Sequence, residues 1–336
     1  MGCAIVSALQ CETMNSSTFP PVHREIAAAV RMCEPTVSWV DTADGARLRV
    51  MSFGPDDAPT IVLAHGWACR AEYWLPQIQG LAGEFRVVCY DQRGHGFSST
   101  GDRDIDGDVV GDDLAAVMDA AVASPAIVIG HSMGGISILS WWKRHPEQAK
   151  QKSVGAVLAN TTLGSIATET RLLPFNNGSE LAIRIGRILL GATLPMPRGR
   201  LTRDAVRKLV MNPRRTTDEQ ANFVCEIART CNAGVRARTA LALADLDLGD
   251  EAAEAVGVPA VVTTGTFDQV LPDSMGKRIA EIIDRTGHLE ALVELETGHT
   301  GNIEAPEKFN DIARKLAERY LLTPTEADAE PAAKAG

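Results

Sequence analysis

The 336-residue sequence lacks a long apolar run, because no stretch of about 18 uncharged apolar residues occurs in it. We therefore expect no membrane-spanning helix. Basic charge is also in short supply, since 33 lysines and arginines stand against 43 aspartates and glutamates, a formal net charge of −10. A field of that sign repels a phosphate backbone, which argues against nucleic acid as a partner. A small-molecule substrate fits this composition better.

Cysteine motifs, metal-ligand spacings and nucleotide-binding glycines are missing as well. The seven cysteines are an odd number without any C-x-x-C pair, which favours reduced thiols over a disulfide framework. The opening residues lack the basic region of a secretory signal, so the sequence predicts a cytoplasmic protein. Histidines and carboxylates lack ligand spacing, and no G-x-G-x-x-G follows a strand pattern, so we expect no metal and no cofactor.

Short apolar runs recur along the chain and are typical of strands buried on both faces of a parallel sheet. Six such runs cover residues 60–65, 86–91, 126–131, 155–160, 259–265 and 291–296. Before them, TVSWV and ARLRVMSFG flank the turn signal ADG and predict an antiparallel hairpin. Amphipathic helical patterns lie between most of the runs. This alternation predicts an α/β fold with a mostly parallel open sheet and helices on both faces.

The alternation of strands and helices stops after residues 155–160, the sixth expected strand when the two strands of the hairpin are counted. Residues 161–250 carry the helical patterns AIRIGRILL, RDAVRKLV and EQANFVCEIARTC without a convincing strand, so we expect an inserted helical cap. Residues 36–160 and 251–321 would then form the sheet domain, preceded by an extension with a short helix over residues 1–35. The small and acidic residues 322–336 predict a disordered tail.

One strand-to-helix junction carries a serine between glycines. Gly130-His131-Ser132-Met133-Gly134 matches G-x-S-x-G directly after an apolar strand pattern and at the start of a helical pattern. In such an elbow the central residue has a strained backbone, and the two glycines let strand and helix approach closely. Ser132 Oγ would then stand at the carboxyl edge of the sheet, where open α/β sheets bind ligands. Ser132 is therefore the expected nucleophile.

A serine hydroxyl needs a base that accepts its proton, and His299 follows the last strand in ETGHTGNIEAP, at the required edge. His131 adjoins the nucleophile and is expected to point away from it. The base needs a carboxylate that fixes its tautomer, and Asp268 in TTGTFDQVLP lies just beyond the preceding strand. Its rival Asp273 is expected to cap the next helix, and Asn160 carries no charge. Asp268 is therefore the expected acid.

The loop after the strand over residues 60–65 offers half of an oxyanion hole. In its turn HGWA the backbone N–H of Trp67 is one expected donor, and the N–H of Met133, next to the nucleophile, is the other. His65 and Gly66 are expected to shape this loop. Each donor of this kind contributes ~10²–10³ in rate.

These motifs together resemble the α/β-hydrolase fold superfamily, in its serine-nucleophile branch of bacterial esterases, lipases and cofactor-free peroxidase-like enzymes. The resemblance runs from about Thr36 to Leu321 and includes HGW, YDQRGHGFS, GHSMGG, GTFDQVLP and GHTGNIEAPEKF, with the order Ser, Asp, His. It implies a hydrolase that forms an acyl-enzyme on Ser132, with His299 moving the proton and water completing the cycle.

The reaction stays open within that resemblance. Hydrolysis of a carboxylic ester or thioester is the leading interpretation. Carbon–carbon bond hydrolysis, perhydrolysis and a non-catalytic small-molecule receptor of the same fold are the alternatives. Epoxide hydrolases and haloalkane dehalogenases are less similar, since they use an aspartate where this chain has Ser132. Epoxide hydrolases also use tyrosines of the cap to protonate the opening ring, whereas all three tyrosines of this chain lie outside the expected cap.

The expected cap contains a basic segment, defined as Arg184 to Arg215, in which nine lysines and arginines accompany a single acid, Asp204. The basic segment either meets an anionic partner, such as a membrane surface or the phosphates of an acyl carrier, or forms a solvated face that balances the acidic core. Charged runs are usually solvated, so the second interpretation is favoured.

Overall fold

The computed structural model describes residues 24–166, 170, 191, 193 and 196–322, and within them eight strands form one sheet. Its order is β1-β2-β4-β3-β5-β6-β7-β8. The strands are β1 (Thr36–Asp41), β2 (Arg47–Phe53), β3 (Thr60–Ala64), β4 (Arg86–Tyr90), β5 (Ala126–His131), β6 (Ser153–Ala159), β7 (Ala260–Gly265) and β8 (Leu289–Leu295). Strands β1, β2 and β4 pair antiparallel in turn, and all other pairs are parallel. The predicted mostly parallel α/β sheet is confirmed.

The six expected parallel strands coincide with β3 to β8 within two residues at each end. One feature of the prediction is wrong, because β8 is not buried on both faces. Leu292 in β8 remains 37% exposed, since β8 is the last strand of the sheet and has a neighbour on one side only. An apolar run alone does not distinguish a central strand from an edge strand.

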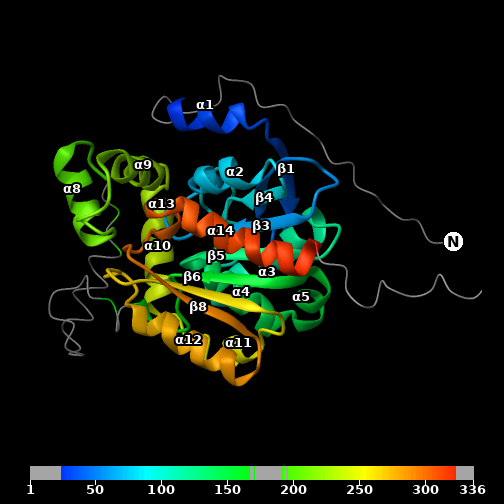
Figure 1. The fold of residues 1–336 in the computed structure, drawn as a ribbon. Coiled ribbons are helices and arrows are strands. Elements are labelled where there is room, and N and C mark those ends of the chain that lie inside the picture. The colour runs from blue at the N-terminus through cyan, green and yellow to red at the C-terminus, as the bar shows by residue number, and fades with distance from the viewer. Residues whose placement is uncertain (1–23, 167–169, 171–190, 192, 194–195, 323–336) are drawn as a thin grey trace, which may run out of the picture.

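Helices cover both faces of the sheet (Figure 1). Alternate residues of a strand point to opposite faces of the sheet, so their side chains belong to two separate hydrophobic cores. In β5, Ile127 and Ile129 belong to one core and Val128 to the other. The first core includes residues of α1 (Arg24–Met32), α2 (Leu75–Leu81) and α14 (Pro306–Ala317). The second includes residues of α3 (Gly107–Ala121), α4 (Met133–Arg144), α11 (Glu251–Glu254) and α12 (Asp273–Arg285).

Short helical elements connect these parts. They are the 3₁₀ helix η2 (Ala71–Trp74), α5 (Pro146–Lys152), α13 (Gly301–Glu304) and the final turn η3 (Glu318–Leu322). Asp273 is the first residue of α12 and not its cap, and its carboxylate pairs with Lys277 one turn later at 2.8 Å. The prediction for Asp273 is thus wrong by one position, since Pro272 occupies the cap.

After β6, the helices α8 (Arg200–Leu209), α9 (Asp218–Arg229) and α10 (Ala233–Ala244) precede α11 and β7; they lie within residues 161–250, where the cap is expected, and are called the cap. Helix α9 begins with a capping box, in which Thr217 and Gln220 each bond the backbone N–H of the other at 3.0–3.1 Å. The pattern AIRIGRILL, with Arg184 and Arg187, lies outside the described residues, as do residues 1–23 and all of the expected tail beyond Leu322. Among the described residues, no helix is long and apolar enough to cross a membrane.

Candidate active site

Ser132 occupies the junction between β5 and α4 in a strained backbone conformation, with φ 54° and ψ −117°. Neighbouring strands hold it there. Its N–H donates to the carbonyl of Ala159 in β6 at 2.8 Å, and its carbonyl accepts from Thr161 Oγ1 at 2.8 Å. A non-glycine residue keeps a positive φ only where its surroundings compel it, which is frequent at functional sites.

The glycines around Ser132 are required by close approach. A β-carbon on Gly134 would overlap the carbonyl of Ala64 in β3, and a β-carbon on Gly130 would overlap the carbonyl of Gly134. The expected spacing role of Gly130 and Gly134 is therefore what the backbone geometry demands. The elbow brings β3, β5 and α4 together at the carboxyl edge of the sheet.

Asp268 and His299 are joined by a hydrogen bond of 2.8 Å between His299 Nδ1 and Asp268 Oδ2. Both residues are buried, in the loops that follow β7 and β8. The other oxygen, Asp268 Oδ1, accepts from the backbone N–H groups of Val270 and Leu271 at 2.8 and 2.9 Å. Because a carboxylate oxygen accepts, His299 Nδ1 is assigned as the donor of this bond, and Nε2 is the ring nitrogen left for another partner.

Asn160 also binds the carboxylate of this pair. It follows β6 with φ 47°, and its Nδ2 donates to Asp268 Oδ2 at 2.9 Å. The sequence excluded Asn160 as the acid and gave it no other function. In the structure it is a second side-chain donor to the carboxylate that binds His299.

His131, expected to point away from the nucleophile, has its ring against His299. The ring centroids are 4.9 Å apart, and His131 Nε2 lies 2.8 Å from the backbone carbonyl of His299. Burial, with the neighbouring His299, lowers the pKa of His131 to about 3, so the ring is neutral and donates from Nε2. Within the described part of the chain, no hydrogen bond joins Ser132 Oγ to His299. Such bonds are often long before substrate binds.

The loop after β3 packs directly on the elbow. A β-carbon on Gly66 would lie 3.1 Å from Ser132 Cβ. The next residue, Trp67, donates from its ring Nε1 to the carbonyl of Arg236 in α10 at 2.9 Å, so the cap anchors this loop. Among the described residues, the backbone N–H groups of Trp67 and Met133 have no acceptor, as oxyanion donors require.

His65, which is expected to shape that loop, bonds the backbone on two sides, and Gln92 adds contacts that the sequence did not indicate. His65 Nε2 accepts from the Gln92 backbone N–H at 3.0 Å, and His65 Nδ1 donates to the Gly66 carbonyl at 2.7 Å. Burial, with His95 nearby, lowers the pKa of His65 to about 3 and keeps it neutral. The Gln92 side chain donates to the His65 carbonyl and accepts from Ser137 Oγ of α4 at 3.0 Å. Gln92 thus connects the loop after β3 to α4, the helix that follows Ser132.

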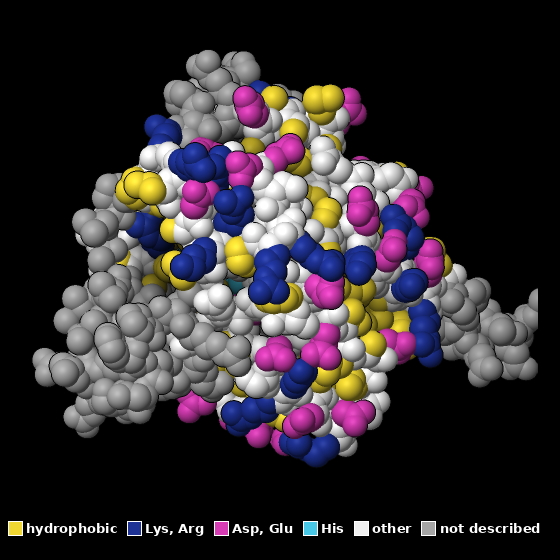
Figure 2. All heavy atoms as spheres, turned by 60° about the vertical axis from the view of Figure 1, so that its left-hand side comes forward, with side chains coloured by type: hydrophobic (Ala, Val, Ile, Leu, Met, Phe, Trp, Pro, Cys, Tyr) yellow, Lys and Arg dark blue, Asp and Glu magenta, His cyan; other side chains and the backbone are white. Residues whose placement is uncertain are grey.

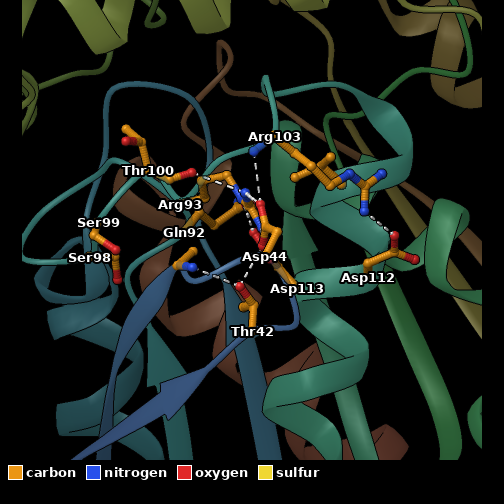
Figure 3. Close-up of polar contacts among 12 residues, drawn as sticks. Thr42, Asp44, Gln92, Arg93, Ser98, Ser99, Thr100, Arg103, Asp112 and Asp113 are labelled. Atoms are coloured by element: carbon orange, nitrogen blue, oxygen red, sulfur yellow. Dashed lines mark hydrogen bonds and ion pairs between the residues drawn. The ribbon is translucent and has the colours of Figure 1, made fainter.

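Ion pairs of the buried Arg93 hold the segment after β4 that presents Gln92. Figure 3 shows Arg93 between Asp44 and Asp113, with Arg93 Nη2 at 2.9 and 2.6 Å from their carboxylate oxygens. Hydrogen bonding by Arg93 keeps the pKa of Asp44 well below its usual range. Since an unpaired buried charge is costly, these contacts fix the segment against α3 and the β1–β2 turn.

Several arginines in the described part of the basic segment pair with carboxylates inside and outside the segment. Arg203 and Arg207 of α8 lie 3.1 and 2.7 Å from the carboxylate of Asp218 in α9, and Arg215 lies 2.6 Å from Glu296. On the face that Figure 2 shows, basic and acidic side chains are intermixed. Among the described residues, no cluster of three or more His, Cys, Asp or Glu side chains could hold a metal ion.

Comparison with known proteins places the chain in a family. Residues 61–312 match the alpha/beta hydrolase family, and the chain belongs to it. It is 25% identical over 280 residues to a 3-oxoadipate enol-lactonase of Acinetobacter baylyi, covering 83% of this chain and 96% of that protein. It is 36% identical over 119 residues to a bifunctional esterase/perhydrolase of Acinetobacter calcoaceticus, covering 35% of this chain and only 43% of that protein.

The fold is shared with solved structures. The enol-lactonase of Burkholderia xenovorans superimposes with a TM-score of 0.66 at 23% identity, covering 83% of this chain and 98% of that one. The relatives include an esterase/perhydrolase and an enol-lactonase, and the family match confirms the expected α/β-hydrolase enzyme class.

Proposed function

We propose that this protein hydrolyses carboxylic esters through an acyl-enzyme, with Ser132 as nucleophile, His299 as base and Asp268 as the acid that orients it. The observation that carries the proposal is the 2.8 Å hydrogen bond between His299 and Asp268, at the same sheet edge as the strained elbow at Ser132. Nucleophile, base and orienting carboxylate are the parts that acyl transfer needs.

In the proposed reaction, Ser132 Oγ attacks the ester carbonyl while His299 Nε2 takes its proton. The backbone N–H groups of Trp67 and Met133 bind the oxyanion of the tetrahedral intermediate. His299 then protonates the departing alcohol. A water molecule, deprotonated by His299, attacks the acyl-enzyme and releases the acid, and Asp268 stabilises the imidazolium in both halves.

The substrate class follows from the relatives. An enol-lactonase opens a cyclic ester and an esterase cleaves an open-chain one, so both kinds are proposed substrates, with thioesters as a third. Perhydrolysis is the second proposed activity, because one relative is an esterase/perhydrolase and hydrogen peroxide can replace water at the acyl-enzyme.

A panel of nitrophenyl esters of increasing acyl length, a lactone, an acyl-CoA and a dienoic acid with a hydrolysable carbon–carbon bond tests the proposal, each with and without hydrogen peroxide. We expect turnover of at least one ester by the wild type and none by Ser132→Ala. Turnover only of a carbon–carbon substrate, or binding without turnover by a folded protein, would replace the ester proposal with one of the alternatives.

The partner and the location remain predictions. We propose a small acyl substrate as the main partner and the cytoplasm as the location, the latter because the cysteines form no disulfide pattern. Contact of the basic segment with an anionic partner is tested by a salt series on a neutral ester and on acyl-CoA. Salt that affects both substrates equally would exclude recruitment by the basic segment.

A further inference from the structure

We propose that Glu304 is a positioning residue that clamps the His299 loop to the cap and thereby sets the base of the reaction. The proposal rests on the proposed function of His299. Glu304 is the last residue of α13, five positions after His299, and is partly buried.

The Glu304 carboxylate binds the residues on both sides of His299. The backbone N–H of Gly298 lies 3.1 Å from each carboxylate oxygen, and Thr300 Oγ1 donates to Oε1 at 3.0 Å. A carboxylate accepts at both oxygens and prefers donors of this kind. The backbone before His299 and the side chain after it are therefore held by one group.

The same carboxylate binds the cap. The backbone N–H of Asn212, between α8 and α9, donates to Glu304 Oε2 at 2.7 Å. Thr216 Oγ1 lies 3.1 Å from that oxygen and shares its single proton between it and the Asn212 carbonyl. Glu304 thus connects the segment over residues 210–216 to the His299 loop.

The two segments also touch directly at His299. The His299 backbone N–H donates to the Val210 carbonyl at 2.7 Å. A β-carbon on Gly298 would lie 2.5 Å from the backbone of Met211, so only glycine allows this approach. The position of His299 therefore depends on where the cap segment lies. Glu304 is one of the side chains that bond the two segments, beside Asn212, whose Nδ2 donates to the Glu296 carbonyl at 2.9 Å, and it is the one whose carboxylate also bonds the residues on both sides of His299.

Glu304→Gln is the informative substitution. It keeps the shape of the side chain but removes its negative charge and replaces one acceptor oxygen by an NH₂ group. In either orientation the Gly298 N–H faces one oxygen and one NH₂ group in place of two oxygens, and with NH₂ at the Oε2 position the bond from Asn212 is lost as well. The matched control is Glu307→Gln, three residues later, because Glu307 is exposed.

The test measures kcat and KM on an ester that the wild type turns over and Ser132→Ala does not. We expect Glu304→Gln to lower kcat by about 10–100-fold with KM within about twofold, since a displacement of order 1 Å at a catalytic group costs on the order of 100-fold. Glu307→Gln should match the wild type. An unchanged kcat in folded Glu304→Gln, even with a lower Tm, would overturn the proposal.

Two further measurements keep the outcome decisive. If Glu304→Gln does not fold, Thr300→Val removes one donor beside His299 and should lower kcat several-fold in the same way; no change would overturn the proposal.

If the wild type turns over no ester, the proposed function fails separately. The downfield proton resonance of His299 Nδ1–H, assigned by its loss in His299→Ala, then decides: a shift or broadening in Glu304→Gln supports the clamp, and an unchanged signal contradicts it.

Discussion

Asn160 and His299 donate to the same oxygen of Asp268, at 2.9 and 2.8 Å. The carboxylate that orients the proposed base is therefore itself oriented by an uncharged side chain from the neighbouring strand end. With the two backbone donors on its other oxygen, Asp268 has no freedom to rotate away from His299.

Removal of the Asn160 amide should weaken catalysis without weakening binding. Asn160→Gly is the suitable variant, because glycine tolerates the φ of 47° at this position. We expect kcat to fall about tenfold with KM unchanged, since a hydrogen bond to a charged group contributes about 1.5–3 kcal/mol. Steady-state kinetics on a nitrophenyl ester measures this, and an unaltered kcat would show that Asp268 does not need the amide.

The strained backbone at Ser132 predicts that glycine at this position gives a more stable protein than alanine does. Ser132→Gly should relieve the backbone strain at φ 54°, whereas Ser132→Ala should retain it. We expect the glycine variant to be more stable than the alanine variant by about 1 kcal/mol, with both inactive. Urea unfolding of the two variants measures the difference, and equal stabilities would contradict a strained elbow.

Close packing at the elbow predicts that Gly134 cannot be replaced. Gly134→Ala would drive a β-carbon into the Ala64 carbonyl, whereas Gly83→Ala, the control, meets nothing within 4 Å. We expect Gly134→Ala to lower the free energy of unfolding by about 1–3 kcal/mol or more, and Gly83→Ala to change it little. Denaturant unfolding of both proteins distinguishes a steric requirement from a general intolerance of substitution.

Two buried histidines predict a loss of stability in mild acid. Burial lowers the pKa of His65 and of His131 to about 3, while the unfolded chain has a histidine pKa near 6.5. Below pH of about 6.5 the unfolded state therefore binds more protons, and the free energy of unfolding falls by up to about 1.4 kcal/mol per pH unit for each histidine, down to pH of about 3. Above pH of about 6.5 neither histidine contributes a pH dependence.

His131→Gln tests this pH dependence. Between pH of about 7.5 and about 5, the variant should lose about 2 kcal/mol less stability than the wild type, although it starts from a lower value. Urea unfolding at the two pH values measures both losses. Parallel losses in the two proteins would mean that His131 is protonated in the folded state.

The sequence predicted those parts of the molecule that depend on local pattern. Strands β3 to β7 follow from short apolar runs, and the elbow follows from glycines that only a tight strand-to-helix turn requires. The edge position of β8 escaped prediction because strand order is set by packing and not by the run itself. The cap of α12 was missed by one residue, a shift that propensity alone does not resolve.

The supporting residues of the site escaped prediction because their partners are far away in the chain. Asn160 binds Asp268 from 108 positions away, Gln92 binds Ser137 from 45, and Glu304 binds Asn212 from 92. The residue type of Asn160, Gln92 or Glu304 does not by itself indicate a catalytic function. The one sequence signal was position, since Asn160 and Gln92 lie just after strands and Glu304 ends the short helix that follows His299.

The central claim is an activated serine at position 132, and covalent labelling tests it most directly. Intact-mass spectrometry after treatment with a fluorophosphonate compares the wild type with Ser132→Ala and His299→Ala. The account predicts a single adduct on Ser132 of the wild type and none on either variant. A folded wild type without an adduct, or with an adduct that survives in Ser132→Ala, would contradict it.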